Sequence, residues 1–105
     1  MKFGLKDEIL DQINKEIHKI ENIDRALIFG SRATGNFKEG SDIDIAILGD
    51  NLNIDHILKL QDLIDDLDIP YFTDVVIQNR INNQKLLEHI DKFGIVFFER
   101  KKAIF

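Results

Sequence analysis

Short apolar segments separated by amphipathic stretches set the strongest limit on the fold of this 105-residue chain. Residues 5–20 carry an isoleucine or leucine every three or four positions, the period of an amphipathic helix. The runs at 24–29 and 42–48 are short and rich in branched apolar residues, as buried strands are. The later elements that we predict are a helix from 54 or 55 to 67, a strand at 72–77, a helix from 82 or 83 to 92, and an edge strand at 95–98.

This order of helices and strands predicts a single α+β domain over residues 1–105. We expect two layers, with a small mixed four-stranded sheet and helices packed on one of its faces. The composition, 44% hydrophobic and 31% charged, is that of a globular protein. A chain of this size buries one core and leaves little volume for a separate substrate-binding unit. Part of any active site would therefore come from another molecule.

Charge and composition exclude several classes of function. A net charge of −5 argues against direct binding to nucleic acid or to acidic membranes, both of which need a basic surface. The absence of cysteine excludes a disulfide framework, a thiol nucleophile and a cysteine-based zinc site. We see no apolar stretch of the length that a membrane span or a signal peptide needs. We expect a soluble cytoplasmic protein that binds no membrane.

Two aspartates interrupt the second predicted strand. Because side chains alternate between the faces of a strand, Asp42 and Asp44 share one face and the intervening isoleucines form the core face. Two neighbouring carboxylates repel each other, and a divalent cation such as Mg²⁺ or Mn²⁺ relieves that repulsion. Asp74 is a third acid inside an apolar strand. If its strand lies beside the second one, the three carboxylates form a cluster able to hold two metal ions.

The loop at residues 30–41 has the residues that a phosphate group needs. Gly30 lets the backbone come close to a ligand, and Ser31 offers a hydroxyl and an amide. We expect a helical turn at the start of this loop, whose free amides would point at an anion. Arg32 is either a further phosphate contact or an exposed loop cation. Ser41 is either a nucleotide-binding residue or a turn residue before the strand. The loop is not a P-loop, because Asn and Phe follow Gly35 where Lys and Ser or Thr are required.

Two further binding motifs are excluded. The dinucleotide-binding pattern G-x-G-x-x-G is absent from the sequence. The aspartates do not form an EF-hand calcium loop, because apolar residues occupy its ligand and turn positions.

The string Phe29-Gly30-Ser31, followed after ten residues by Asp42-Ile43-Asp44-Ile45, resembles the signature of the DNA polymerase β-like nucleotidyltransferase superfamily. The longer stretch GSRATGNFKEGSDIDIAIL is similar to the minimal nucleotidyltransferases of bacteria and archaea. The resemblance implies a polymerase β palm-like fold. It further implies that Asp42 and Asp44 bind two Mg²⁺ ions, with Mn²⁺ as an alternative. Asp74 would bind the catalytic ion and help to activate the acceptor hydroxyl, while Gly30 and Ser31 grip the β- and γ-phosphates.

The same resemblance implies a reaction and a partner. A nucleoside monophosphate, expected to be AMP from ATP, is transferred to a hydroxyl and pyrophosphate leaves. Members of the minimal branch are often encoded beside a HEPN-domain toxin as the antitoxin of the pair, and some transfer AMP to a tyrosine of that partner. We therefore expect a HEPN-type partner and a homo- or hetero-oligomer.

Two other functions remain open at this point. The chain could be a non-catalytic module that binds a nucleotide or a partner and neutralises that partner by contact. It could also modify a small molecule or an RNA end, which the acidic net charge disfavours.

Two groups of residues outside the loop and the aspartates also give predictions. The histidines His18, His56 and His89 lack the spacing of metal ligands and are interpreted as surface residues. Aromatic residues near the C-terminus are candidates for a partner surface: Phe93, Phe97, Phe98 and Phe105.

Overall fold

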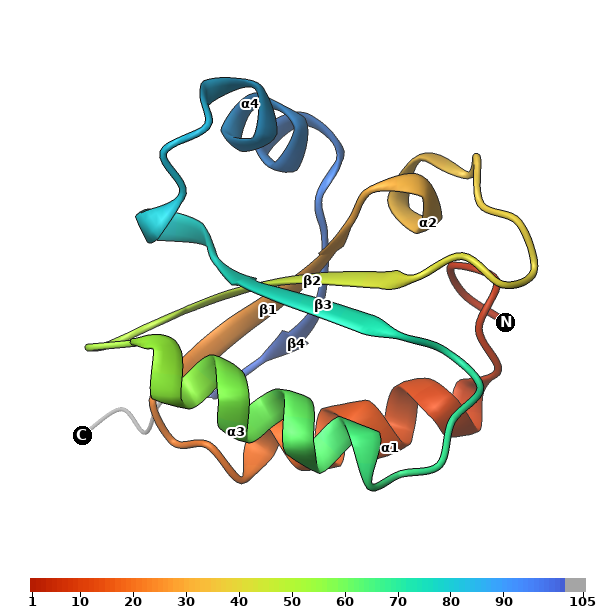
Figure 1. The fold of residues 1–105 in the computed structure, drawn as a ribbon, viewed down its shortest axis with the longest axis horizontal. Helices are drawn as coiled ribbons and strands as arrows, with labels where there is room; N and C mark the ends of the chain where they lie inside the picture. Colours follow the sequence, from red (N-terminus) through yellow and green to blue (C-terminus); the bar gives the residue numbers. More distant parts are fainter. Residues whose placement is uncertain (102–105) are drawn as a thin grey trace.

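The computed structural model describes residues 1–101, so Phe105 lies outside the described residues. In chain order the elements are α1 (Asp7–His18), β1 (Ile23–Phe29), α2 (Ser31–Thr34), β2 (Ile43–Gly49), α3 (Ile54–Asp65), β3 (Thr73–Ile77), the 3₁₀ turn η1 (Gln78–Arg80), α4 (Gln84–Phe93) and β4 (Ile95–Glu99) (Figure 1). Every helix and strand predicted from the sequence is present, with its ends displaced by no more than two residues.

The sheet is mixed, with the strand order β3-β2-β1-β4. β1 pairs with β2 and with β4 in the antiparallel direction, whereas β2 and β3 are parallel and joined through α3. β4 is an edge strand, as predicted. β2 lies between β1 and β3, so residues at its start are next to the end of β1 and the start of β3.

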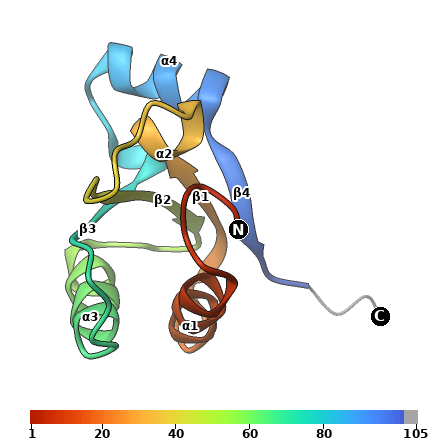
Figure 2. The ribbon, with the colours of Figure 1, turned by 90° about the vertical axis from the view of Figure 1, so that its right-hand side faces the viewer.

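The alternation of side chains along β2 divides the core in two. The three isoleucines of β2 are fully buried in the main core, together with residues of α1 and α3 on the same face of the sheet. α4 lies over the opposite face (Figure 2), where Ile90 packs against Phe29 and Ala46 in a smaller cluster. The α+β class is confirmed. The expectation of helices on one face holds for α1 and α3, but α4 covers apolar residues on the face that also carries the aspartates.

Asparagine side chains fix where the two later helices begin. The Asn53 side chain accepts a hydrogen bond from the Asp55 amide at 2.9 Å, and Nδ1 of His56 accepts one from the Asn53 amide at 3.0 Å. His56 is therefore a half-buried helix cap and not the surface residue that we predicted. Asn83 begins α4 by accepting from the Leu86 amide at 3.2 Å. Within residues 1–101, none of the helices combines the length and the apolar character needed to cross a bilayer.

The aromatic residues near the C-terminus have different environments. Phe97 and Phe98 pack against the main core and are half-buried. Phe93, at the end of α4, is 40% exposed. Among the described residues of the predicted partner surface, Phe93 is more exposed than Phe97 and Phe98.

Candidate active site

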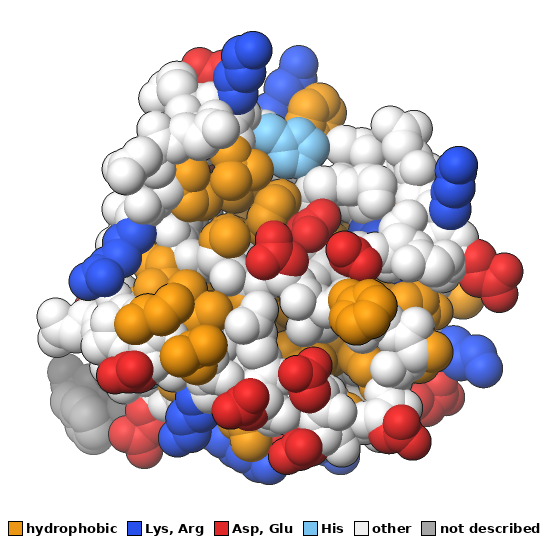
Figure 3. All heavy atoms as spheres, viewed as in Figure 1, with side chains coloured by type: hydrophobic (Ala, Val, Ile, Leu, Met, Phe, Trp, Pro, Cys, Tyr) orange, Lys and Arg blue, Asp and Glu red, His pale blue; other side chains and the backbone are white. Residues whose placement is uncertain are grey.

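Asp42, Asp44 and Asp74 meet at one end of the β2–β3 pair. The parallel register places Asp44 directly opposite Asp74, so both side chains leave the same face of the sheet. Asp42 precedes Asp44 by two residues and lies just before β2. Asp44 is half-buried, while Asp42 and Asp74 are exposed. Figure 3 shows acidic side chains gathered on this face between α4 and α2. The condition that we set from the sequence, that the third strand lies beside the second, is confirmed.

Asp44 lies in an electrostatic environment that opposes the ionisation of its side chain. Burial raises the pKa of Asp44 above its ordinary value, and the negative charges of Asp74 and Asp42 raise this pKa further. His89 acts in the opposite direction. An ionised Asp44 is thus unfavourable unless a cation or a hydrogen-bond donor approaches it.

This electrostatic environment predicts that Asp44→Asn stabilises the protein in the absence of metal. A carboxyl group whose pKa is raised on folding binds its proton more tightly in the folded state. Ionisation of this group therefore lowers the stability of the protein. The loss begins as the pH rises above 3.8, the ordinary pKa, and is complete above the raised pKa of the folded state. At neutral pH the Asp44→Asn variant should therefore have the higher Tm. The difference should disappear as the pH falls towards 3.8. Thermal unfolding followed by circular dichroism in EDTA measures it, and a lower Tm for the variant at neutral pH would contradict this electrostatic account.

Position 30 accommodates only glycine, because the backbone there lies against the side chain of Asp44. Its φ is +72°, a region that other residues rarely adopt, and a Cβ at this position would collide with Oδ2 of Asp44. Its amide donates a hydrogen bond to Nε2 of His89 at 2.9 Å. The amide of Gly30, a residue that we expected to grip a phosphate, is thus occupied by an imidazole. Ser31, the first residue of α2, follows directly, and its amide has no acceptor within a helix that begins there.

Arg32 is neither an exposed cation nor free to bind a phosphate. Its side chain is 2% exposed and donates to the carbonyl oxygen of Ser41 from Nε at 3.1 Å and from Nη2 at 2.8 Å. Nη1 donates to the carbonyl oxygen of Phe3 at 2.8 Å. The guanidinium also lies 5.2 Å from the ring centre of Phe37 and 4.8 Å from that of Tyr71. Arg32 therefore ties the loop at 30–41 to the N-terminal segment.

Ser41 has the turn role among the two that we considered. Its hydroxyl accepts a hydrogen bond from the Lys38 amide at 2.8 Å, and its carbonyl oxygen accepts from Arg32. Both contacts hold the end of the loop just before the aspartates.

His89 is the residue at this site that the sequence prediction missed. It lies on α4 and is half-buried, and its ring centre is 6.3 Å from that of Phe29 and 5.3 Å from that of Phe93. Its partner Gly30 is 59 positions away in the chain. Our interpretation of His89 as a surface residue was wrong, because only the packing of α4 on the sheet brings it to the loop.

The donor atoms suit a hard divalent cation, but their side chains are not gathered around one point. Carboxylate oxygens are the ligands that Mg²⁺ and Mn²⁺ prefer, and the pKa of Asp44 is raised by burial and then by the negative charges of Asp74 and Asp42. Within residues 1–101, no three His, Asp or Glu side chains are arranged to hold a metal ion as they stand. Asp42 and Asp74 are exposed, so their side chains have room to turn towards a cation.

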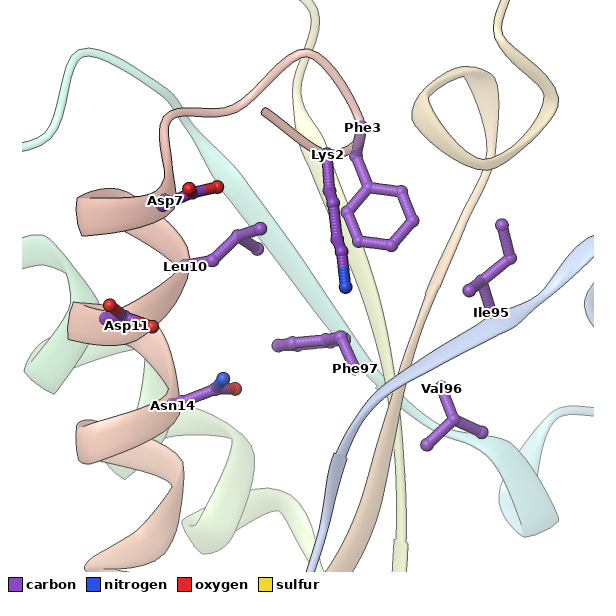
Figure 4. A pocket seen from close by; sticks show the side chains of 9 residues that line it. All are labelled: Lys2, Phe3, Asp7, Leu10, Asp11, Asn14, Ile95, Val96 and Phe97. Carbon is purple, nitrogen blue, oxygen red and sulfur yellow. The ribbon is translucent and has the colours of Figure 1, made fainter.

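A separate groove lies between α1 and β4 (Figure 4). It has a volume of about 650 Å³ and is lined by polar residues such as Lys2 and Asn14 and by apolar ones such as Phe3 and Phe97. None of the aspartates of the cluster and no residue of the loop at 30–41 lines this groove. It is distinct from the candidate active site.

Comparisons with known proteins identify the family and the fold of the chain. A family model described as polymerase beta, nucleotidyltransferase, matches residues 11–103. A chain in a crystal structure of a toxin–antitoxin with AMP-PNP superposes with a TM-score of 0.70 at 24% identity, covering 88% of this chain and 74% of that one. A chain in the toxin–antitoxin MntA–HepT gives 0.66 at 21% identity, covering 90% and 74%.

A third structure contains the tri-AMPylated Shewanella oneidensis HEPN toxin in complex with an MNT antitoxin. It gives a TM-score of 0.68 at 21% identity, covering 91% of this chain and 74% of that one. At these identities the solved structures show a shared fold. No curated protein sequence matches the chain.

Proposed function

The chain belongs to the polymerase beta nucleotidyltransferase family, and we propose that it transfers AMP from ATP to a hydroxyl of a HEPN-domain partner, and so acts as the antitoxin of that partner. The observation that carries this proposal is the register of β2 and β3, which brings Asp44 opposite Asp74 beside the loop that begins at Gly30. A cluster of three acids next to a glycine–serine turn suits metal-assisted transfer of a phosphoryl-type group.

Each residue has a distinct role in the proposed reaction. Asp42 and Asp44 would hold Mg²⁺, with Mn²⁺ as an alternative, and such ions when bound supply charge neutralisation for the triphosphate. The Ser31 amide and hydroxyl would bind the β- and γ-phosphates. Asp74 is exposed and belongs to the edge strand β3, so a hydroxyl of another molecule can reach it. The acceptor hydroxyl gives up its proton to Asp74 as its oxygen bonds to the α-phosphorus, and the bond between the α-phosphorus and the departing pyrophosphate breaks.

Two observations support an acceptor on a partner protein. Asp42 and Asp74 are exposed at one end of the sheet that residues 1–101 form, where another molecule can approach them. Several solved structures of similar fold are toxin–antitoxin complexes, and one contains a tri-AMPylated HEPN toxin. We accordingly place the active form in a complex with its HEPN-type partner.

A second function, neutralisation by contact alone, is favoured by one observation. The carboxylates are not already arranged around a metal ion in the described part of the chain. If contact is sufficient, the Asp42→Ala/Asp44→Ala variant still neutralises the toxin in cells. If AMP transfer is the mechanism, the same variant expressed at the wild-type level fails to neutralise it.

Equilibrium binding of ATP, GTP, CTP and UTP, in Mg²⁺ and in EDTA, tests the nucleotide site. We expect ATP to bind most tightly, to need Mg²⁺, and to bind more than about 100-fold more weakly to Asp42→Ala/Asp44→Ala, because the metal ligands are lost. The matched control is Asp62→Ala/Asp65→Ala, which removes two exposed acids from α3 and changes the net charge equally. Binding that survives EDTA, or that the control weakens as strongly, would contradict the proposed site.

A further inference from the structure

His89 connects α4 to the loop that begins at Gly30. β1 ends at Phe29, which pairs with Asp44 as the last residue of the β1–β2 ladder. The amide of Gly30 therefore follows the last pair of this ladder and takes its acceptor from outside the sheet. It is satisfied by Nε2 of His89 at 2.9 Å, in a partly buried environment. A partly buried amide without an acceptor is unfavourable, so this bond stabilises the conformation that the turn adopts.

The imidazole is itself held in place. Its ring contacts Phe29 at one side and Phe93 at another, with centre-to-centre distances of 6.3 Å and 5.3 Å. Since Nε2 accepts from Gly30, Nδ1 is the ring nitrogen left to act as a donor. The acceptor is thus presented by a side chain whose position follows from the packing of α4 on the sheet.

The bond matters because Gly30 has more conformational freedom than any other residue type would have there. Its carbonyl oxygen accepts from the amides of Ala33 and Thr34 at 3.1 Å and 3.2 Å. Its amide is fixed by His89, so both peptide planes that flank Gly30 are held. The carbonyl of Gly30 and the amide of Ser31 share one rigid plane. Holding Gly30 therefore sets the direction in which the Ser31 amide points.

We propose that His89 is a positioning residue for the phosphate end of the nucleotide site, acting through the Gly30 amide to orient Ser31. The ligand is a nucleoside triphosphate, so the role rests on the proposed function. His89 touches the loop and not the reacting atoms. The role also couples α4 to the active site, since a displacement of this helix would release the Gly30 peptide.

Two substitutions separate the hydrogen bond from ring packing. His89→Gln keeps an acceptor, Oε1, at the position of Nε2 but loses the ring. His89→Phe keeps the ring but loses the acceptor. We expect Mg²⁺–ATP affinity to fall about tenfold in His89→Phe, the effect of one hydrogen bond, and to stay within about threefold of wild type in His89→Gln. His18→Gln and His18→Phe, at an exposed histidine of α1, are matched controls that should change neither value.

The outcomes of this experiment are distinct. Wild-type affinity in His89→Phe, or equal weakening in both His89 variants, would overturn the positioning role while the nucleotide site stands. If the wild-type protein binds no nucleotide, the proposed function fails and this role fails with it.

Nuclear magnetic resonance gives a readout that needs neither a foldable variant nor a nucleotide. In the wild-type protein, the ¹⁵N shifts of His89 should show a protonated Nδ1 and an accepting Nε2, and the Gly30 amide should exchange slowly with solvent. A proton on Nε2, or fast exchange of Gly30, would overturn the proposal.

Discussion

The Asp74→Asn variant should bind Mg²⁺–ATP within about tenfold of wild type and transfer AMP at least about 10³-fold more slowly. Asp74 is on the edge strand β3 and is exposed, whereas Asp42 and Asp44 adjoin the loop that would hold the triphosphate. Removing one negative charge from the acceptor side should therefore impair the chemical step more than binding. Asparagine keeps the size of the side chain, so packing is unaffected.

The measurement is the single-turnover rate of label incorporation from [α-³²P]ATP into the partner protein, beside equilibrium binding of the nucleotide. Asp62→Asn on α3 serves as the matched control, because it makes the same change at an exposed position outside the cluster. Transfer at the wild-type rate would remove Asp74 from the mechanism. Equal losses of binding and transfer would instead place it with Asp42 and Asp44 at the triphosphate.

The Arg32→Ala variant should lose about 2–4 kcal/mol of unfolding free energy, the range of charge-assisted hydrogen bonds broken in a buried site. The substitution leaves the carbonyl oxygens of Phe3 and Ser41 without their donor and removes the guanidinium from the rings of Phe37 and Tyr71. Arg32→Lys should lose most of the same free energy. A lysine ammonium lacks the planar fork that reaches both carbonyl oxygens while lying against two rings.

Urea unfolding measures this loss, and Arg25→Ala supplies the comparison. Arg25 is half-exposed, and its ion pair with Glu99 is 3.6 Å long, so its removal should change stability by less than about 1 kcal/mol. If Arg32→Ala were no more destabilising than Arg25→Ala, the buried contacts of Arg32 would not hold the loop as we describe. If Arg32 instead bound a phosphate, Arg32→Ala would reduce the affinity for ATP without destabilising the protein.

The sheet and the acidic cluster were predictable because residue type determines them locally. Alternating isoleucines in β2 leave only one way to bury that strand, and this places Asp44 on the opposite face. Asp74 needed one further fact, the pairing of β2 with β3, which follows from connecting two parallel strands through α3.

The roles of Arg32 and His89 were not predictable in the same way. Arg32 donates hydrogen bonds to backbone carbonyl oxygens. Because every residue has a carbonyl oxygen, no pattern of residue types predicts these partners. His89 reaches the Gly30 amide only because α4 covers the second face of the sheet. The apolar side of a short helix does not determine which face of the sheet the helix will cover. The signal present was Ala46, an apolar residue on the same face as Asp44, which needed a covering element.

We infer that this chain transfers the nucleotidyl part of ATP to a protein. The most direct test incubates the wild-type protein with Mg²⁺ and an extract of its own host cells, once with [α-³²P]ATP and once with [γ-³²P]ATP. We expect label from the α-phosphate, and none from the γ-phosphate, on a protein that mass spectrometry identifies as having a HEPN domain. The Asp42→Ala/Asp44→Ala variant should leave that protein unlabelled. Label entering from the γ-phosphate, or no label above that of the variant, would contradict the account.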